Sequence, residues 1–299
     1  MPIDDLPIAD FARVYLRTPS ELAVGNRQLA MKITATIITL NEAENISEAI
    51  ESVEWADEIL VVDSESTDAT RDLAERLGAR VIVNPWPGFS QQKQFAADAA
   101  GNDWIFSLDA DERVSPELKS SIDELRTKDA TQLADGYRVA RRAWYLGRWI
   151  RGGGWYPDYQ LRFFNRQHGH WGDRIIHESV VMAQGSRVET LRGDLLHYSM
   201  SDPSHHRRMI DQRYAPLGAA QMHRDDKRTS RLQIACAGPL AFLRSFVIKG
   251  GFRDGQAGYT IARLAAHHAS LKHSLLYDLQ NQSETKGHDG SNPLQNRER

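Results

Sequence analysis

Short apolar runs alternate with amphipathic runs through the first half of the chain. Apolar runs that favour buried strands lie at residues 33–40, 58–63, 79–84 and 104–108. Between them, apolar positions at helical spacing predict helices at residues 42–53, 67–77 and 90–100. Strands and helices that alternate at this period predict a mainly parallel sheet with helices on both faces.

Local signals mark the ends of these helices. Asn41 and Glu44 form the pattern of a capping box at the start of the first helix. Gly78 stands where the second helix should end in a left-handed residue. Ser115 and Pro116 predict the start of a further helix, with serine as its N-cap.

After residue 136 the pattern changes. Further strands are predicted at residues 137–146, 160–166, 180–183 and 187–197, as a mixed extension of the same sheet. Three consecutive glycines, Gly152 to Gly154, indicate a loop that bends sharply or approaches a ligand closely. A helical region begins at Asp202 and Pro203 and continues to about residue 280.

The chain therefore divides into four parts by pattern. Residues 1–30 are expected to form a flexible extension, because the regular alternation begins only at Ile33. Residues 31–200 form an α/β domain and residues 201–280 a helical region, in which 12 Lys and Arg between residues 200 and 276 outnumber 5 Asp and Glu. Residues 281–299 are polar and are expected to be a disordered tail.

Composition narrows the function. A net charge of -3 and a pI near 6.4 give no nucleic-acid signature, and the single cysteine allows neither an internal disulfide nor a zinc cluster. No segment reaches the roughly 18 uninterrupted apolar residues of a membrane span; the longest, 232–248, contains Gly238, Pro239 and Arg244. The N-terminus is acidic and lacks an apolar signal core, so a cytoplasmic protein is expected.

Two carboxylates follow the fourth predicted strand directly. Asp109 and Asp111 are two residues apart, so on an extended backbone they lean to the same side. In open α/β sheets ligands bind beyond the carboxyl ends of the strands. Mg²⁺ or Mn²⁺ bound there would take one or two carboxylates, with substrate phosphates and water as its other ligands. The alternative is a solvated acidic turn before a helix.

Other strand ends carry residues suited to a nucleotide. Thr39 and Glu42 follow the first strand, Asp63 ends the second, and Lys93 lies in the first turn of the third helix. Asp63 can accept a hydrogen bond from a base imide or a ribose hydroxyl, or cap the following helix instead. Lys93 can reach phosphate or base, or simply be an exposed lysine. Neither a Gly-x-Gly-x-x-Gly nor a phosphate-loop motif follows the first strand, which argues against a dehydrogenase and an ATPase.

Four motifs in order resemble the N-terminal half of a family 2 glycosyltransferase with the GT-A fold. They are Thr-Leu-Asn-Glu-Ala-Glu-Asn-Ile at 39–46, Val-Val-Asp-Ser-Glu-Ser-Thr-Asp at 61–68, Gln-Gln-Lys-Gln-Phe-Ala at 91–96 and Leu-Asp-Ala-Asp-Glu at 108–112. Segments at 155–164, 176–178, 196–199 and 251–259 are similar to a lipopolysaccharide-core β-1,4-glucosyltransferase-like subgroup. The resemblance covers about residues 31–280. It implies a Rossmann-like mixed, mainly parallel sheet with flanking helices, plus a C-terminal helical region.

The resemblance also implies a chemistry. Thr39, Glu42, Asp63 and Lys93 would hold the nucleotide, Asp109 would contact the ribose or the metal, and Asp111 would bind the metal, Mg²⁺ or Mn²⁺. The reaction would be an inverting displacement from a nucleotide-diphosphate sugar, with a UDP-sugar favoured. The acceptor would be a lipopolysaccharide-core or other cell-envelope glycan, or a lipid-linked acceptor.

An inverting displacement needs a base for the acceptor's proton. Asp158 is the first choice, although Pro157 precedes it where many relatives carry a second acid. Glu178 is the second choice. The structural alternatives are a turn-capping aspartate at Asp158 and an ion pair of Glu178 with Arg174. His197 would complete the metal shell or touch the diphosphate, unless it is merely hydrogen-bonded at a strand end.

Other interpretations remain open at this point. A sugar nucleotidyltransferase would need a Gly-rich loop with Arg after the first strand, which residues 41–44 do not provide. A nucleotide-sugar-binding protein without turnover would not need the acids at 109, 111, 158 and 178. The C-terminal helices combine apolar residues at 240, 242, 243, 246 and 247 with Arg244, Lys249 and Arg253. That combination suits the inner face of an anionic membrane or a core-packing helix with a basic outer face.

Overall fold

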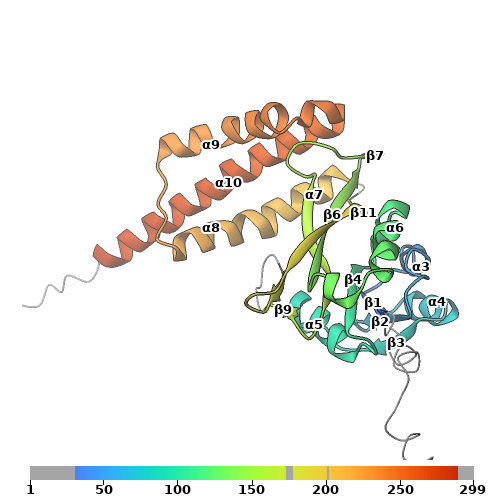
Figure 1. The fold of residues 1–299 in the computed structure, drawn as a ribbon. Helices are drawn as coiled ribbons and strands as arrows, with labels where there is room; N and C mark the ends of the chain where they lie inside the picture. Colours follow the sequence, from blue (N-terminus) through green and yellow to red (C-terminus); the bar gives the residue numbers. More distant parts are fainter. Residues whose placement is uncertain (1–30, 173–177, 201, 289–299) are drawn as a thin grey trace, which may run out of the picture.

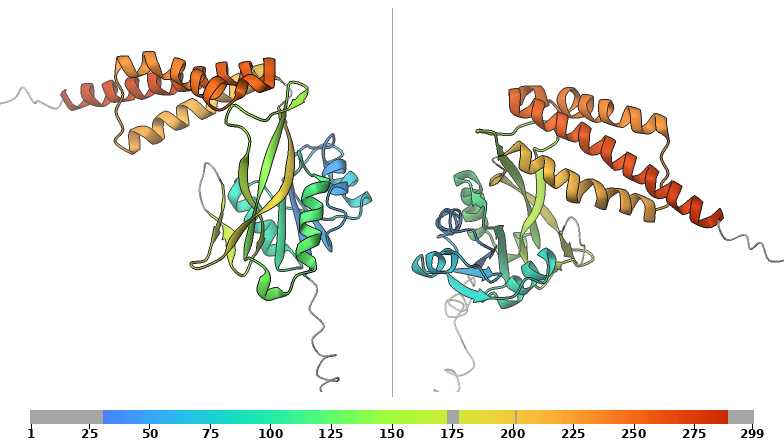
Figure 2. Two further views of the ribbon diagram at one scale, coloured as in Figure 1. Left: turned by 45° about the horizontal axis from the view of Figure 1, so that its top comes forward. Right: turned by 180° about the vertical axis from the view of Figure 1, so that it is seen from behind.

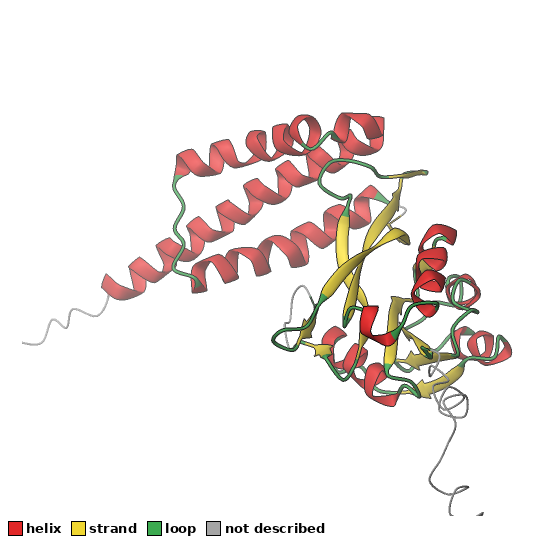
Figure 3. Cartoon of the chain, viewed as in Figure 1, coloured by secondary structure: helices red, strands yellow, loops and turns green. Residues whose placement is uncertain are grey.

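The computed structural model describes residues 31–172, 178–200 and 202–288 of the 299-residue chain. These residues form a twisted sheet flanked by helices, and a layer of long helices that extends beyond one end of the sheet (Figures 1 and 3). The predicted fold class, an α/β fold with flanking helices and a helical C-terminal region, is confirmed.

The first half of the sheet is parallel, as predicted. Its spatial order is β3-β2-β1-β4, and the strands are β1 (Ile33–Thr39), β2 (Glu58–Asp63), β3 (Arg80–Val83) and β4 (Trp104–Asp109). Every residue of β1 is buried, because β1 lies at the centre of this half with helices on both faces.

Alternate residues of the strands pack into two separate cores. On one face, Ile37 and Leu108 pack in the same core as apolar residues of α3 (Ile46–Glu51), α4 (Thr70–Arg76) and α6 (Pro116–Arg126). On the other face, Ile38 and Leu60 pack with α5 (Phe89–Ala99).

The start of the first helix differs from the prediction. The helix begins at Ile46, and Asn41 has a left-handed backbone with φ 55°. Its side-chain oxygen accepts a hydrogen bond from the backbone N–H of Thr67, 26 residues away. The predicted capping box of Asn41 and Glu44 is therefore wrong, because Asn41 ties two loops together instead of capping a helix. The predictions for Gly78, with φ +82°, and for Ser115, which accepts from Leu118 N–H, are confirmed.

The second half of the sheet is mixed, as predicted. β8 (Asp158–Asn165) runs antiparallel to β4 and to β6 (Gly136–Tyr145), whereas β11 (Val188–Met200) runs parallel to β6. The described residues also contain four shorter strands, which are β5 (Glu112–Val114), β7 (Arg148–Trp149), β9 (Gly169–Trp171) and β10 (Val180–Met182). The sequence pattern predicted β10 but missed β5, β7 and β9.

The C-terminal region forms a layer of helices in which α10 (Gly255–His288) lies between α8 (Ala215–Arg224) and α9 (Arg231–Leu243) (Figures 1 and 2). α8 continues α7 (Pro203–Met209) and η3 (Ile210–Tyr214), and α9 continues into η4 (Arg244–Ile248) and η5 (Gly251–Asp254). Asp202 caps α7, as predicted.

The boundary of the polar tail differs from the prediction. Residues 281–288 are helical, because α10 continues to His288. The predicted extension, residues 1–30, and the rest of the predicted tail, residues 289–299, lie outside the described part of the chain.

Candidate active site

The carboxyl ends of three neighbouring strands define the candidate site. Thr39 at the end of β1 pairs in register with Asp63 at the end of β2, and Ile38 pairs with Asp109 at the end of β4. These residues lie far apart in sequence but side by side in the sheet. Since ligands of open α/β sheets bind at this edge, the strand order places the predicted nucleotide residues where a ligand would lie.

Two buried oxygen atoms at this edge have no hydrogen-bond donor among the described residues. Asp63 is fully buried; its Oδ2 accepts from Ser66 N–H at 2.8 Å, while Oδ1 has no donor. The hydroxyl of Thr39 is also buried and unpartnered. Asp63 does not cap α4, which begins seven residues later at Thr70. Buried polar atoms without partners are costly in a protein interior, and they are suited to donors that a ligand brings.

Glu42, which follows β1, is influenced by the charge of Asp111, which follows β4. Its carboxylate accepts a hydrogen bond from Asn45 Nδ2 at 2.7 Å. Partial burial raises the pKa of Glu42 above its ordinary value; the Asn45 hydrogen bond opposes this, and repulsion from Asp111 adds to it. The carboxylates of Glu42 and Asp111 are therefore close enough to repel each other, and a cation or hydrogen-bond donor between them would stabilise the ionised form of both.

Lys93 is a buried ion-pair partner, not an exposed helix lysine. Only 1% of its side chain is exposed, and its Nζ lies 2.9 Å from Asp109 Oδ1 and 3.4 Å from Glu178 Oε1. The ammonium also lies 5.0 Å from the ring centre of Trp171. Burial works to raise the pKa of Asp109, but the charges of Lys93 and Arg162 outweigh it and hold that pKa well below the usual range.

Arg162 is a buried residue of the site that the sequence analysis did not single out. Its Nη2 donates to Asp109 Oδ2 and to Glu112 Oε1, each at 3.0 Å. Glu112 is fully buried and also accepts from the backbone N–H of Asp109 at 3.0 Å. Both residues lie in segments that resemble the family, and the available signal was an arginine between the apolar Leu161 and Phe163 of a predicted strand. The network holds Asp109 between two cations.

Asp111 and His197 are brought together by a strand that the sequence did not predict. β5 pairs with β11 so that Glu112 stands opposite His197, and the backbone N–H of Tyr198 donates to Asp111 O at 2.9 Å. His197 Nε2 then lies 3.2 Å from Asp111 Oδ2. Asp109 faces Lys93 and Arg162 instead, and the described residues contain no cluster of three or more His, Cys, Asp and Glu arranged to hold a metal.

Asp158 lines a cavity of about 270 Å³. The first residue of β8, it pairs with Arg141 Nη2 at 2.7 Å and accepts from Gln160 Nε2 at 2.7 Å. The cavity is also lined by Arg141, Ala143, Gly154, Trp155 and His197. Asp158 is thus held by an arginine and faces a space next to His197, which is a different environment from a turn cap.

Glu178 lies on the other side of the network. It pairs with Lys93 and does not line the cavity that contains Asp158. Its predicted alternative partner, Arg174, lies outside the described residues, as does the neighbouring His177. The two candidate bases therefore occupy separate places, with Glu178 beside the Lys93–Asp109 pair and Asp158 beside Arg141.

The C-terminal helices hold the glycine loop that leads to Asp158. Asp254 is buried, and its carboxylate accepts from the backbone N–H groups of Arg151, at 3.1 Å, and Gly152, at 2.8 Å. The hydroxyl of Ser245 donates to Gly153 O at 3.0 Å. Any side chain at Gly152 would collide with the backbone of Gly250, since its Cβ would lie 2.5 Å from the carbonyl oxygen. The helical layer therefore fixes the conformation of the glycine loop through these hydrogen bonds and close contacts.

Asp254→Asn is expected to destabilise the protein by about 1.5–3 kcal/mol, because hydrogen bonds to a charged group are lost in a buried place. The glycine loop should shift with it, so the acceptor KM should rise while donor affinity stays near that of the parent protein. Urea unfolding and steady-state kinetics measure the two effects. Asp278→Asn, at an exposed position of α10, is the matched control and should change neither. Equal stability of the two variants would contradict the structural role of Asp254.

The family comparison decides the class of the protein. The model of glycosyl transferase family 2 matches residues 34–189, about half of the chain, which includes the strands of the sheet except most of β11. The chain belongs to glycosyl transferase family 2. The matched region contains the ends of β1, β2 and β4, as well as Asp158 and Glu178. With the observed sheet, this membership also confirms the predicted GT-A fold and shows that the protein is a glycosyltransferase.

Relatives match along most of their length. An uncharacterized glycosyltransferase of Rickettsia bellii is 34% identical over 84% of this chain and 88% of its own. The lipopolysaccharide core biosynthesis glycosyltransferase LpsC of Rhizobium meliloti is 31% identical over 83% of this chain and 92% of its own. The similarity to these family 2 enzymes therefore extends beyond the sheet into the helical layer.

Solved structures resemble a smaller part of the chain. Glucosyl-3-phosphoglycerate synthase from Mycobacterium tuberculosis, in complex with Mn²⁺, UDP and glucosyl-3-phosphoglycerate, matches with a TM-score of 0.32 and 24% identity. The match covers 44% of this chain and 51% of that protein. Mannosyl-3-phosphoglycerate synthase from Rubrobacter xylanophilus also has a TM-score of 0.32, at 23% identity, over 43% of this chain and 44% of its own.

Proposed function

We propose that this family 2 enzyme is an inverting glycosyltransferase that moves a sugar from a nucleotide-diphosphate sugar to a hydroxyl of a cell-envelope acceptor. The observation that carries the proposal is the position of His197. It pairs with Asp111 beside the nucleotide edge of the sheet, and it also lines the cavity that contains Asp158. A single residue thus connects the part of the site suited to a diphosphate with the part suited to an acceptor hydroxyl.

A UDP-sugar is the favoured donor. The free Oδ1 of the buried Asp63 accepts a hydrogen bond but cannot donate one while it is ionised. Uracil presents an imide N–H that matches this acceptor, whereas the corresponding ring nitrogen of adenine is itself an acceptor. Thr39, Glu42 and Lys93 border the same edge, and we assign the remaining contacts with the nucleotide to them and to Asp109.

The residues at Asp111 and His197 fit a divalent metal. A carboxylate and an imidazole are ligands that Mn²⁺ accepts, and oxygen ligands from a diphosphate and water also suit Mg²⁺. We assign Asp111 and His197 as the protein ligands. Asp109 contributes its negative charge nearby, because Lys93 and Arg162 already occupy its carboxylate. A metal held there would neutralise the charge that develops on the leaving nucleoside diphosphate.

Asp158 is the proposed base. As the acceptor oxygen bonds to the anomeric carbon, the bond from that carbon to the diphosphate oxygen breaks, and Asp158 takes the hydroxyl proton. Arg141 fixes the carboxylate at the cavity wall through its bonds at 2.7 and 3.0 Å. Attack from the side opposite to the leaving group inverts the configuration at the anomeric carbon.

The name of one relative supports a class of acceptor. The Rhizobium meliloti enzyme carries lipopolysaccharide core biosynthesis in its name and matches this chain over most of its length. We therefore propose a lipopolysaccharide-core or other cell-envelope glycan, or a lipid-linked acceptor, used in the cytoplasm at the inner face of the cytoplasmic membrane.

A thermal-shift screen with UDP-, GDP-, dTDP- and ADP-sugars, with and without Mn²⁺, tests the donor. A UDP-sugar with metal should raise the melting temperature most, because a ligand at a hundred times its Kd stabilises the native state by about 2.7 kcal/mol. Asp63→Ala should lose this shift. Donor hydrolysis under the same conditions then separates an enzyme from a binding protein. A preference for ADP-sugars would contradict the assignment of Asp63.

A further inference from the structure

α9 and the start of η4 carry a row of exposed apolar side chains. Leu232 is 73% exposed and Leu240 62% exposed, and Cys236, Leu243 and Val247 are exposed as well. Their spacing of four, four, three and four residues puts all five on one side of the helix. Gly238 is the only buried residue of α9. This face is therefore not a core-packing face.

Cationic side chains flank this apolar stripe, and Asp225, Asp226 and Asp254 bound the stretch that contains them. No Asp or Glu occurs between Asp226 and Asp254. The same stretch contains six Lys and Arg, all exposed: Lys227, Arg228, Arg231, Arg244, Lys249 and Arg253. Three precede the apolar stripe, Arg244 lies within its length between Leu243 and Val247, and two follow it. An apolar surface with cations at both ends is complementary to lipid tails bordered by anionic headgroups.

Within the described residues, Arg231–Ile248 is the one segment long and apolar enough to cross a membrane. Its attachment to α10 favours a helix that lies flat. A Cβ at Gly238 would come within 2.5 Å of Ser270 Oγ on α10, so the two helices are in close contact there. A spanning orientation would have to separate α9 from α10 or carry the charged residues of α10 into the lipid.

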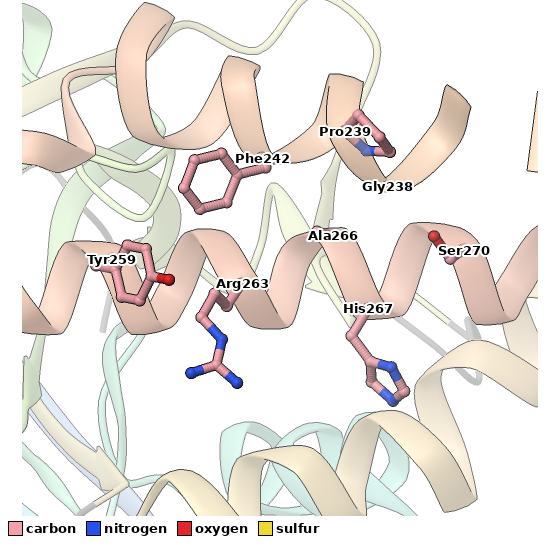
Figure 4. Close-up of a pocket in the computed structure, with 8 residues that line it drawn as sticks. All are labelled: Gly238, Pro239, Phe242, Tyr259, Arg263, Ala266, His267 and Ser270. Atoms are coloured by element: carbon pink, nitrogen blue, oxygen red, sulfur yellow. The ribbon is translucent and has the colours of Figure 1, made fainter. Parts of the chain in front are cut away.

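A groove lies between α9 and α10 (Figure 4). It has a volume of about 510 Å³, and Phe242 of α9 meets Tyr259 of α10 edge to face, with ring centres 5.8 Å apart. The guanidinium of Arg263 lies 5.8 Å from the Tyr259 ring. Tyrosine and arginine together are typical of the headgroup level of a bilayer.

A second copy of the chain fits this surface less well. Two copies joined through α9 would bring the exposed Arg231, Arg244 and Lys249 of both copies into one interface, and residues 227–253 contain no Asp or Glu. Like charges in a partly desolvated interface repel strongly. An anionic lipid surface meets the apolar stripe and the cations together.

We propose that the outer face of α9, with η4 and η5, is the surface by which the protein docks on an anionic lipid membrane. The helix lies in the interface, with Leu240 and Ile248 among the inserted side chains and the flanking cations at the headgroups. This inference names the surface for the membrane location proposed above, and its lipid-binding step does not depend on the sugar donor.

The docking surface is continuous with the cavity that contains Asp158. A Cβ at Gly154, which lines the cavity, would lie 2.6 Å from Lys249 Nζ, so Lys249 stands at the rim. Its neighbour Ile248 is 74% exposed and belongs to the docking surface. A docked protein would therefore hold the cavity rim beside the headgroups, within reach of an acceptor whose lipid part remains in the membrane.

Vesicle flotation of the full chain tests the proposal. The protein should float with vesicles of phosphatidylglycerol and phosphatidylcholine, and much less with phosphatidylcholine alone. Raising NaCl from about 0.05 M to about 0.5 M should weaken binding, because added salt shortens the screening length. Leu240→Gln with Ile248→Gln keeps the charge and should reduce the bound fraction at least about tenfold.

A matched pair of substitutions controls for exposed apolar residues in general. Leu77→Gln with Leu217→Gln changes side chains that are 40% and 37% exposed, on α4 and α8, and should leave flotation unchanged. Donor hydrolysis without vesicles should be equal in all three proteins, which separates a failure of docking from a failure of the proposed enzyme. No flotation at low salt, or equal flotation of both double variants, would overturn the proposal. So would a dimer that Leu240→Gln with Ile248→Gln converts to a monomer, since the face would then be a self-interface.

Discussion

Asp111→Ala is expected to reduce sugar transfer by at least about a hundredfold, the scale on which removal of a main charge-stabilising group lowers kcat. The proposed metal would lose its carboxylate ligand, and His197 would remain as its single protein ligand. The fold should be retained, because the Asp111 side chain is 26% exposed and is not part of an apolar core. Transfer assays at saturating donor, with direct Mn²⁺ binding measured by calorimetry, give the two readouts.

Asp103→Ala is the control for this prediction. Asp103 is an exposed aspartate in the turn just before β4, paired with Arg166 on the protein surface. It should keep full activity and Mn²⁺ affinity. A normal transfer rate in Asp111→Ala would show that the metal assignment is wrong. Loss of transfer with unchanged Mn²⁺ binding would instead place Asp111 in contact with the substrate.

Asp158→Asn is expected to cut transfer by about 10²–10⁴-fold while donor and metal affinity stay near those of the parent protein. The amide cannot take the acceptor's proton, but it keeps the shape of the side chain at the cavity wall. Because Asp158 pairs with Arg141, the substitution also removes a charge partner, so the melting temperature should be measured beside the kinetics. Donor affinity is the readout that separates loss of the base from a damaged site.

Glu178→Gln is the matched substitution, carboxylate to amide, at the second candidate. Glu178 contacts Lys93 and does not line the cavity, so Glu178→Gln should raise the acceptor KM more than it lowers kcat. The reverse pattern, with Glu178→Gln nearly inactive and Asp158→Asn nearly normal, would assign the base to Glu178. Mild effects in both variants would exclude both residues as the base.

The alternation of strands and helices was predictable because it depends on local spacing. The continuous apolar runs that form the buried strands β1, β2 and β4, and the left-handed Gly78, are properties of short segments, and each prediction is confirmed. The start of α3 was not predictable in the same way. Asn41 satisfies a partner 26 residues away, and a tertiary hydrogen bond of this kind overrides a local capping pattern.

In the candidate site, too, local features were predictable from the sequence and contacts between distant residues were not. Thr39, Asp63, Lys93, Asp109 and Asp111 were predicted from the sequence because each follows, or faces, the end of a predicted strand, whereas Asp158 and Glu178 were predicted from the resemblance to the family. The environment of Lys93 could not be predicted in this way, because its buried ammonium contacts Glu178 and Trp171, which come from the second half of the chain. A charge is buried only where distant partners compensate it, and spacing does not report those partners.

The sequence by itself determined which residues stand at the carboxyl edge of the sheet, because strand ends and polar side chains are both local features. Only the tertiary structure decided which of them meet. The short strand β5 pairs with β11 and brings His197 to Asp111, and the chain's last helices supply Asp254 to hold the loop before Asp158. It also decided that α9 exposes its apolar face, since amphipathic spacing is the same whether the partner of that face is protein or lipid.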